Sequence, residues 1–270
     1  MSLFLNEGSV EYIDEIVKRW GRIVVPFFRN YGKSTTAAHG FGSGFVARVR
    51  GKHWLVTALH VVDDAIRADA CVFNLCGKGV VLEHMAFFPD RANDLAFAPL
   101  ERILMQHRFA RVAAIDLDAE QDGTAEVGYH LLMGYPASKN RLNLKFDELE
   151  RRLHSVTVER IHPQEDIATN VREPVFFRYD QKAQVDSFFH PLQPPGLHGM
   201  SGGPALELRA SRLFGNEYRF HVRLSGVLLE WKKQEKVVVA ASAVRLRELL
   251  RKVEDVQHGS RPALSGYDKT

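Results

Sequence analysis

The stretch GFGSGFVARVRGKHWLVTALHVV, residues 40–62, contains the pattern that decides the fold. Its two runs GFVARV and HWLVTA are short, rich in β-branched and aromatic residues, and separated by a charged turn that contains glycine. Such runs are typical of β-strands. Three more runs of this kind, IVVPFF, VVLEHMAFF and DLAFAPL, occur nearby, and no helix-length pattern separates most of the five. We therefore expect an antiparallel barrel or sandwich rather than a βαβ array.

A second β-rich region follows an acidic, polar connection at residues 115–128. Its runs are YHLLMGYP, HSVTVERI, PVFFRYD, GPALEL, YRFHVRLSGVLL and VVVAAS. Between the first two, NRLNLKFDELERRL is expected to form a short helix or an inserted loop. The sequence thus predicts an all-β body with one unit at 22–118 and a second at 119–255.

Helices are expected at the two ends of this body. Apolar residues recur at helical spacing from Val10 to Trp20, with Ser9 as the candidate N-cap, so residues 1–21 are assigned to an amphipathic N-terminal helix. A second helix closes the second unit, with Ser242 as its candidate cap and leucines such as Leu246 and Leu250 on one face. Residues 256–270 are expected to be a flexible tail.

The composition narrows the classes of function. The chain has 36 basic and 33 acidic residues, a formal net charge of +3, and no run of five or more basic residues, which is weak support for nucleic-acid binding. Its two cysteines, Cys71 and Cys76, fit reduced core residues better than a disulfide framework or a zinc site. The N-terminus lacks a signal-peptide pattern, and no apolar stretch approaches about 18 residues. We expect a cytoplasmic protein without membrane, nucleic-acid, metal or cofactor partners.

Three polar residues in these β-rich runs have the types that nucleophilic catalysis needs. Ser201 lies in HGMSGGPAL, where glycines would let its backbone approach a substrate carbonyl. A serine needs a base to take its proton, and His60 in WLVTALHVV is the candidate. Asp94 in NDLAFAPL is the candidate carboxylate to orient that histidine. Each motif also has an ordinary structural interpretation, as a tight turn or a core histidine.

Taken together and in this order, TALHV, NDLAF and GMSGGP resemble the chymotrypsin-type (trypsin-like) serine protease family. These motifs are more similar to those of its bacterial intracellular and periplasmic branch than to those of the digestive enzymes. GSGF, GYP and LSGVLL match the family pattern as well, so the resemblance runs from about residue 22 to 250. It implies two antiparallel β-barrels with the active site between them. It also implies a triad of His60, Asp94 and Ser201, an oxyanion hole formed by the N–H groups of Gly199 and Ser201, and no cofactor.

The sequence departs from the digestive branch in three places. Met200 stands where that branch has an aspartate, and Val61 where it has a cysteine, so we expect neither its zymogen ion pair nor its disulfide. By the family pattern, the residue at the floor of the primary pocket lies shortly before the serine, which implies Pro195 here. No acidic residue lies between His190 and Ser201. Small or apolar substrate side chains are therefore expected. The candidate substrate-binding residues are Pro195, His198, Leu228, Leu229 and Glu230.

Two other functions remain open at this point. GMSGG also fits the G-x-S-x-G nucleophile elbow of an α/β-hydrolase esterase, although strand-like runs rather than a helix follow it. The second alternative is a latent or inactive protease-like module that acts as a regulatory or interaction domain. In that case the N-terminal helix and the 137–153 insertion are the candidate surfaces for a regulatory protein partner. A peptidase and such a module differ in whether Ser201 reacts.

Overall fold

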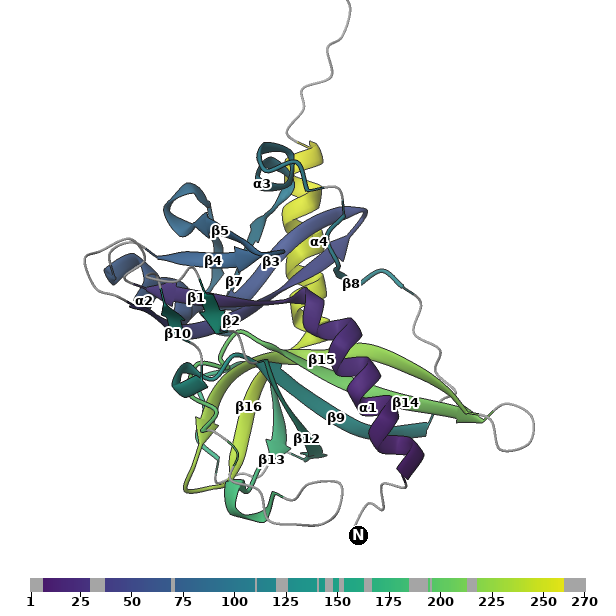
Figure 1. Ribbon diagram of the computed structural model, residues 1–270. Coiled ribbons are helices and arrows are strands. Elements are labelled where there is room, and N and C mark those ends of the chain that lie inside the picture. The colour runs from purple at the N-terminus through teal and green to yellow at the C-terminus, as the bar shows by residue number, and fades with distance from the viewer. Residues whose placement is uncertain are drawn as a thin grey trace, which may run out of the picture.

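The computed structural model describes residues 7–29, 37–68, 71–109, 111–119, 126–139, 141–143, 148–150, 153–162, 167–184, 194, 196–212 and 218–259. Within these residues the chain forms two β units, stacked one above the other in Figure 1. We call them the first sheet and the closed barrel. One helix at each end of the body runs along them.

The first sheet has ten strands, seven of them in the order β5-β4-β1-β2-β3-β7-β6. Their bounds are β1 (Val24–Arg29), β2 (Ala37–Val49), β3 (Lys52–Ala58), β4 (Val72–Leu75), β5 (Lys78–Val81), β6 (Phe88–Asp90) and β7 (Leu95–Pro99). These neighbours pair antiparallel, whereas the short β8 (Ile115–Asp116) pairs parallel with β2. The opening stretch of the sequence analysis therefore becomes the β2–β3 hairpin at the centre of this sheet.

The closed barrel has six strands in the cyclic order β12-β13-β16-β15-β14-β9. Their bounds are β9 (Glu126–Gly134), β12 (His154–Ile161), β13 (Pro174–Arg178), β14 (Pro204–Arg212), β15 (Tyr218–Lys232) and β16 (Val237–Ser242). All neighbouring strands pair antiparallel. One closed barrel beside a second sheet agrees with the expected all-β, chymotrypsin-like double-barrel class.

The insertion after β9 differs from the expected helix or loop. Its described residues form a β-hairpin, β10 (Arg141–Asn143) and β11 (Glu148–Glu150). Although the segment follows the barrel strand β9, β10 pairs with the first sheet, with Leu142 opposite Ala38 of β2. The polar–apolar alternation of RLNLKF has the period of a strand, and β2 offers an edge that can complete its hydrogen bonds.

Four α-helices and four short 3₁₀ helices complete the described chain. They are α1 (Glu7–Trp20), α2 (Leu59–Arg67), α3 (Glu101–Gln106), α4 (Ala243–Gly259), η1 (Gly21–Ile23), η2 (Leu82–His84), η3 (Ala137–Lys139) and η4 (Gln181–Ala183). Because α1 begins at Glu7, the prediction of Ser9 as its N-cap is wrong. The cap of α4 is confirmed, since the Val244 N–H donates to Ser242 Oγ at 3.2 Å. No helix in the described part of the chain has both the length and the apolar character of a membrane span.

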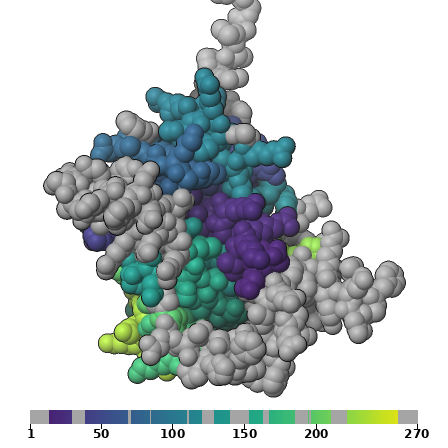
Figure 2. All heavy atoms as spheres, in the orientation of Figure 1, coloured from purple at the N-terminus to yellow at the C-terminus, as the bar shows by residue number. Residues whose placement is uncertain are grey.

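The terminal helices tie the two units together. Ile16 of α1 is only 4% exposed, and α1 lies on the surface across the junction of the units in Figure 2. Helix α4 leaves the barrel and packs against the first sheet, where Lys52 Nζ lies 2.6 Å from Glu254 Oε2. The Arg247 side chain donates to the Leu117 carbonyl at 2.8 Å. These contacts link the C-terminal helix α4 to the first sheet.

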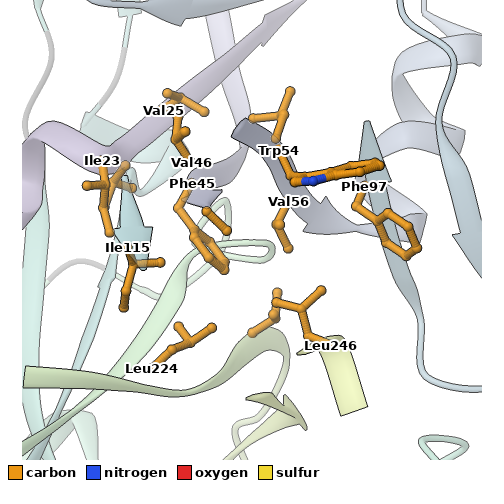
Figure 3. Packing of buried hydrophobic residues seen from close by; sticks show 14 of the residues in the cluster. Ile23, Val25, Phe45, Val46, Trp54, Val56, Phe97, Ile115, Leu224 and Leu246 are labelled. Atoms are coloured by element: carbon orange, nitrogen blue, oxygen red, sulfur yellow. The ribbon is translucent and has the colours of Figure 1, made fainter. Parts of the chain in front are cut away.

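One hydrophobic core runs through both units. Figure 3 shows Phe45 and Ile115 of the first sheet facing Leu224 of the barrel and Leu246 of α4. Trp54 and Phe97 meet edge to face nearby, with ring centroids 5.9 Å apart. Such a continuous core makes the relative position of the units part of the folded structure.

The two cysteines have different environments. Cys71 is buried as expected, and Cys76 is exposed. The prediction of a core position for Cys76 is therefore wrong. Cys76 lies in the turn between β4 and β5 with φ of +48°, so its side chain projects from a loop rather than from the sheet.

Candidate active site

The fold brings His60 and Asp94 together at one end of two paired strands. β3 and β7 pair antiparallel, with Ala58 opposite Leu95, so the residue after β3 and the residue before β7 are neighbours. His60 lies in the first turn of α2, directly after β3. Its Nδ1 lies 2.6 Å from Asp94 Oδ2. Both side chains are partly exposed, which leaves the imidazole accessible from outside the sheet.

Asp94 also holds the start of α2. Its carbonyl oxygen accepts the Leu59 N–H at 2.8 Å, and its Oδ1 accepts the His60 N–H at 3.0 Å. These are N–H groups that a helix leaves without intrahelical partners, and Ala58 before the helix supplies no side-chain cap. Asp94 adopts a left-handed φ of +50°, a conformation that aspartate enters more readily than most residues because its short side chain can hydrogen-bond locally. One residue therefore fixes both the backbone and the ring of His60.

Two opposing effects set the proton affinity of His60. Burial lowers the pKa of the imidazole, and the hydrogen bond and negative charge of Asp94 raise it, with smaller contributions from Asp64 and Asp63. The net result is a pKa above the ordinary value of 6.5. A histidine with this environment is a stronger base than a free one, as a general base requires.

Ser201 lies where two hydrogen-bonded turns meet. The Met200 N–H donates to the Leu197 carbonyl at 2.9 Å, and the Gly203 N–H donates to the Met200 carbonyl at 3.0 Å. The third residues of these turns are Gly199 and Gly202, with φ of +89° and +86°. This is the type II turn pattern, which favours glycine at the third position. The glycines therefore build two successive turns around the serine.

The two turns together present two backbone donors, the N–H groups of Gly199 and Ser201. The His198 carbonyl accepts the Ala137 N–H at 2.8 Å. Because a trans peptide directs its C=O and N–H to opposite sides, the Gly199 N–H faces away from Ala137. Within the described residues neither the Gly199 N–H nor the Ser201 N–H has an acceptor. Two free amides beside a serine hydroxyl can stabilise an oxyanion.

Ser43 of β2 holds this turn against the first sheet. Its N–H donates to the Ser201 carbonyl at 2.9 Å, and its hydroxyl donates to the Gly199 carbonyl at 2.8 Å. The same hydroxyl accepts the Tyr135 N–H at 2.8 Å, and the Ser43 carbonyl accepts the Thr57 hydroxyl at 2.7 Å. Ser43 is fully buried. The motif GSGF is visible in the sequence, but no local pattern predicts this role for Ser43.

The Ser201 hydroxyl points toward β15. It donates to the Leu229 carbonyl at 2.8 Å, and no hydrogen bond joins it to His60 among the described residues. Leu229 is the extra residue of a β-bulge, because Leu228 pairs with Ala240 and Glu230 with Val239. A bulge leaves a backbone group without its ladder partner, and here the serine uses it. Engagement of His60 therefore needs a rotation of the serine side chain.

The predicted substrate-binding residues are placed as follows. Leu228, Leu229 and Glu230 line a cavity beside Ser201. The His198 side chain is exposed, and Pro195 lies outside the described residues. Pairing with β14 and backbone hydrogen bonds to Gly202 and Gly203 occupy one edge of β15 as far as Leu228, and β16 pairs with the other edge from Gly226 onward. The open edge of β15 begins where β14 pairing ends, at Leu229.

The esterase alternative does not fit this geometry. A nucleophile elbow joins a strand to a helix. Here Ser201 lies in the second of two turns, and that turn leads into strand β14, which begins at Pro204. In the described part of the chain, no group of three or more histidine, cysteine or acidic residues is placed to hold a metal ion.

Comparison with solved structures gives remote similarities. The crystal structure of Rv3671c from M. tuberculosis H37Rv, a serine-to-alanine mutant in its inactive form, is 15% identical, with a TM-score of 0.47 over 94% of this chain and 98% of that one. A structure concerning the coupled folding and binding of the intrinsically disordered Sesbania mosaic virus VPg protein is 14% identical, with a TM-score of 0.45 over 85% and 90%. Both scores lie below 0.5. No curated protein matches the sequence.

The family comparison is decisive because it covers most of both β units. The model of the trypsin-like peptidase domain matches residues 42–215. This range begins one residue before Ser43 and contains the His60–Asp94 pair and the turns around Ser201. The chain belongs to the trypsin-like peptidase domain family.

Proposed function

We propose that the protein is a serine endopeptidase that hydrolyses peptide bonds through an acyl-enzyme. Ser201 is the nucleophile, His60 the general base, and Asp94 the carboxylate that orients His60. The N–H groups of Gly199 and Ser201 form the oxyanion hole. The observation that carries this proposal is the His60–Asp94 hydrogen bond together with two backbone amides, at Gly199 and Ser201, that have no acceptor among the described residues.

Each group has a defined part in the reaction. Ser201 Oγ attacks the substrate carbonyl carbon while His60 Nε2 takes the hydroxyl proton. The resulting oxyanion accepts hydrogen bonds from the Gly199 and Ser201 amides. His60 then gives the proton to the leaving amine, which breaks the C–N bond and leaves an ester on Ser201. Water, deprotonated by His60, hydrolyses this ester and regenerates the serine.

The open edge of β15 suits a peptide substrate. From Leu229 onward β15 pairs only with β16 among the described strands, so an extended peptide can add to its free side. Backbone pairing of this kind reads no particular sequence, and side-chain pockets add the selectivity. A cytoplasmic location stays part of the proposal, supported by the low cysteine content of two in 270 residues, which is too few for a disulfide framework.

One observation favours a second candidate, a latent module that regulates or binds without turnover. The Ser201 hydroxyl is hydrogen-bonded to Leu229 and not to His60. A binding partner could then be needed to turn the hydroxyl toward the base. Hydrogen bonds in substrate-free active sites are often poorly aligned, so this contact alone does not argue against activity.

Reaction with a fluorophosphonate, followed by intact-mass spectrometry, separates these functions. We expect one adduct on the wild-type protein and none on Ser201→Ala or His60→Ala. Ser242→Ala, which changes only the exposed cap of α4, is the matched control and should react like the wild type. An unreactive but folded wild type would favour the latent module. An adduct that survives Ser201→Ala would refute the nucleophile assignment.

A further inference from the structure

A small apolar cavity adjoins Ser201 on the barrel side. Its volume is about 20 Å³, and its walls include Leu197, Met200, Leu228 and Val238. These four side chains are at most 6% exposed. A cavity needs about 10–15 Å³ to hold one water molecule. The space beside the nucleophile therefore accommodates one methyl-sized group and nothing larger.

Trp231 also lines this cavity. Trp231 lies on β15 opposite Val238 of β16, two residues after Leu229. Its Cζ3 lies 3.5 Å from the position that a Cβ on Gly196 would occupy. Gly196 belongs to the segment that leads into the Ser201 turns and directly precedes Leu197, which lines the cavity. The indole thus reaches from β15 to the Gly196 segment.

Packing holds the indole in this position. Its ring meets Tyr179 edge to face, with centroids 5.7 Å apart, and Tyr179 is fully buried. Trp231 Nε1 and Tyr179 Oη are both buried without a hydrogen-bond partner in the described part of the chain. On the outer side, Lys233 Nζ lies 5.7 Å from the ring centroid. Because Tyr179 backs the ring, the indole has no free space in the barrel into which to withdraw.

A bound substrate must direct a side chain toward this cavity. Its scissile carbonyl carbon faces Ser201 Oγ, and its carbonyl oxygen faces the Gly199 and Ser201 amides. If the peptide also pairs with β15 at Leu229, the side chain before the scissile bond points between β15 and the Gly196 segment. That is the space in which Trp231 lies.

We propose that Trp231 restricts cleavage to bonds that follow alanine or glycine, with alanine preferred; this inference rests on the proposed peptidase function. Alanine fills the methyl-sized space, whereas glycine leaves it empty. Leucine or phenylalanine has to displace the indole from Tyr179. A single methylene in an apolar pocket changes kcat/KM about 10–200-fold, so a phenyl group is disfavoured by at least about 100-fold.

Peptidyl diphenyl phosphonates that share one peptide and carry alanine or phenylalanine before the phosphorus test this inference. The rate of adduct formation on Ser201 is followed by intact-mass spectrometry. On the wild type we expect the alanine compound to react at least about 100-fold faster. Trp231→Ala should raise the phenylalanine rate about 100-fold or more and lessen the preference for alanine. Lys233→Ala, which leaves the indole in place, should keep the wild-type ratio.

Equal rates for the two compounds on the wild type would overturn the inference, whether or not the Trp231 variant folds. An unchanged preference for alanine in a Trp231→Ala protein that still reacts with a small fluorophosphonate would also overturn it. Failure of the wild type to react with the fluorophosphonate would instead refute the proposed function. The fluorophosphonate, which needs no fit to the cavity, thus separates the two failures.

Discussion

The first sheet and the closed barrel position their residues of the candidate site in different ways. The first sheet holds the His60–Asp94 pair with contacts that all arise inside it, between the ends of β3 and β7 and the start of α2. The barrel carries Ser201, but the turn around Ser201 is held by Ser43 and by close packing against Thr57, which belong to the first sheet. The proposed base therefore depends on local contacts, and the proposed nucleophile depends on the assembly of both units.

Asp94→Asn should have the largest effect on catalysis, about 10⁴-fold in turnover. The asparagine oxygen can still accept the His60 backbone N–H, but its NH₂ group donates to His60 Nδ1. The imidazole proton then stays on Nε2, so Nε2 cannot accept the proton of Ser201. The measurement is kcat on a peptide substrate. Asp90→Asn, four residues earlier in the same sheet, is the control. A larger loss in the Asp90 variant would make Asp90 the partner of His60.

Gly199→Ala should reduce kcat about 10²–10³-fold, the usual cost of losing one oxyanion donor. A Cβ at Gly199 would lie 2.6 Å from the Ala137 nitrogen, so the turn must shift. Gly77 is a matched control, because it has a similar φ of +90° but open space around its Cβ position. Gly77→Ala should lose some stability and keep its activity. Equal activity losses in both variants would mean that strain, rather than the amide position, is responsible.

A buried histidine should make the barrel sensitive to acid. Burial lowers the pKa of His130 to about 4, with Glu207 opposing and Arg160, Arg209 and Arg223 adding to the shift. Between pH 6.5 and 4 the unfolded chain binds a proton that the folded chain excludes, so stability falls as the pH falls, by about 3 kcal/mol in full.

Urea unfolding at pH 7 and pH 4.5 measures this dependence. Replacing His130 with leucine should remove about 2–3 kcal/mol of the difference between the two pH values. Leu132→Val, a packing change without a titratable group in the same strand β9, is the control and should leave the difference unchanged. An acid response that persists in full in the His130 variant would contradict the assignment.

The smallest expected effect is a shift of a pH profile. Because Asp94 raises the pKa of His60, the rate of acylation should increase with pH through a midpoint above 6.5. Stability from the ion pair has the opposite trend, since it is present below pH 6.5 and lost as the pH rises through the folded pKa. The acylation rate of the wild type from pH 5 to 9 gives the midpoint. A midpoint below 6.5 would mean that burial outweighs Asp94.

Local patterns in the sequence predict much of the site. TALHV, NDLAF and GMSGGP place a histidine, an aspartate and a serine at strand ends and a glycine turn, where the structure has them. The bulge at Leu229 and the role of Ser43 follow no local pattern. Ser43 acts on Gly199, 156 residues away, and a bulge depends on the register between two strands.

The same distinction explains the errors in the fold. The strand alternation of RLNLKF is visible, but its partner β2 lies about a hundred residues earlier, so a helix or loop remained an open alternative. Helix α1 begins two residues before Ser9, because a cap residue at the sequence level only sets a preference. Cys76 was expected in the core, but the turn of the β4–β5 hairpin points it outward.

The Ser43 hydroxyl joins Tyr135 of the barrel to the Gly199 carbonyl through one oxygen atom. Separation of the two units therefore breaks the Tyr135 hydrogen bond and the hydrogen bond that supports the turn at Gly199 in the same event. The deuterium exchange rate of the Tyr135 amide becomes a measure of how often the site comes apart. A ligand that slows this exchange stabilises the turn at Gly199 in its Ser43-bound arrangement, wherever on the molecule it binds.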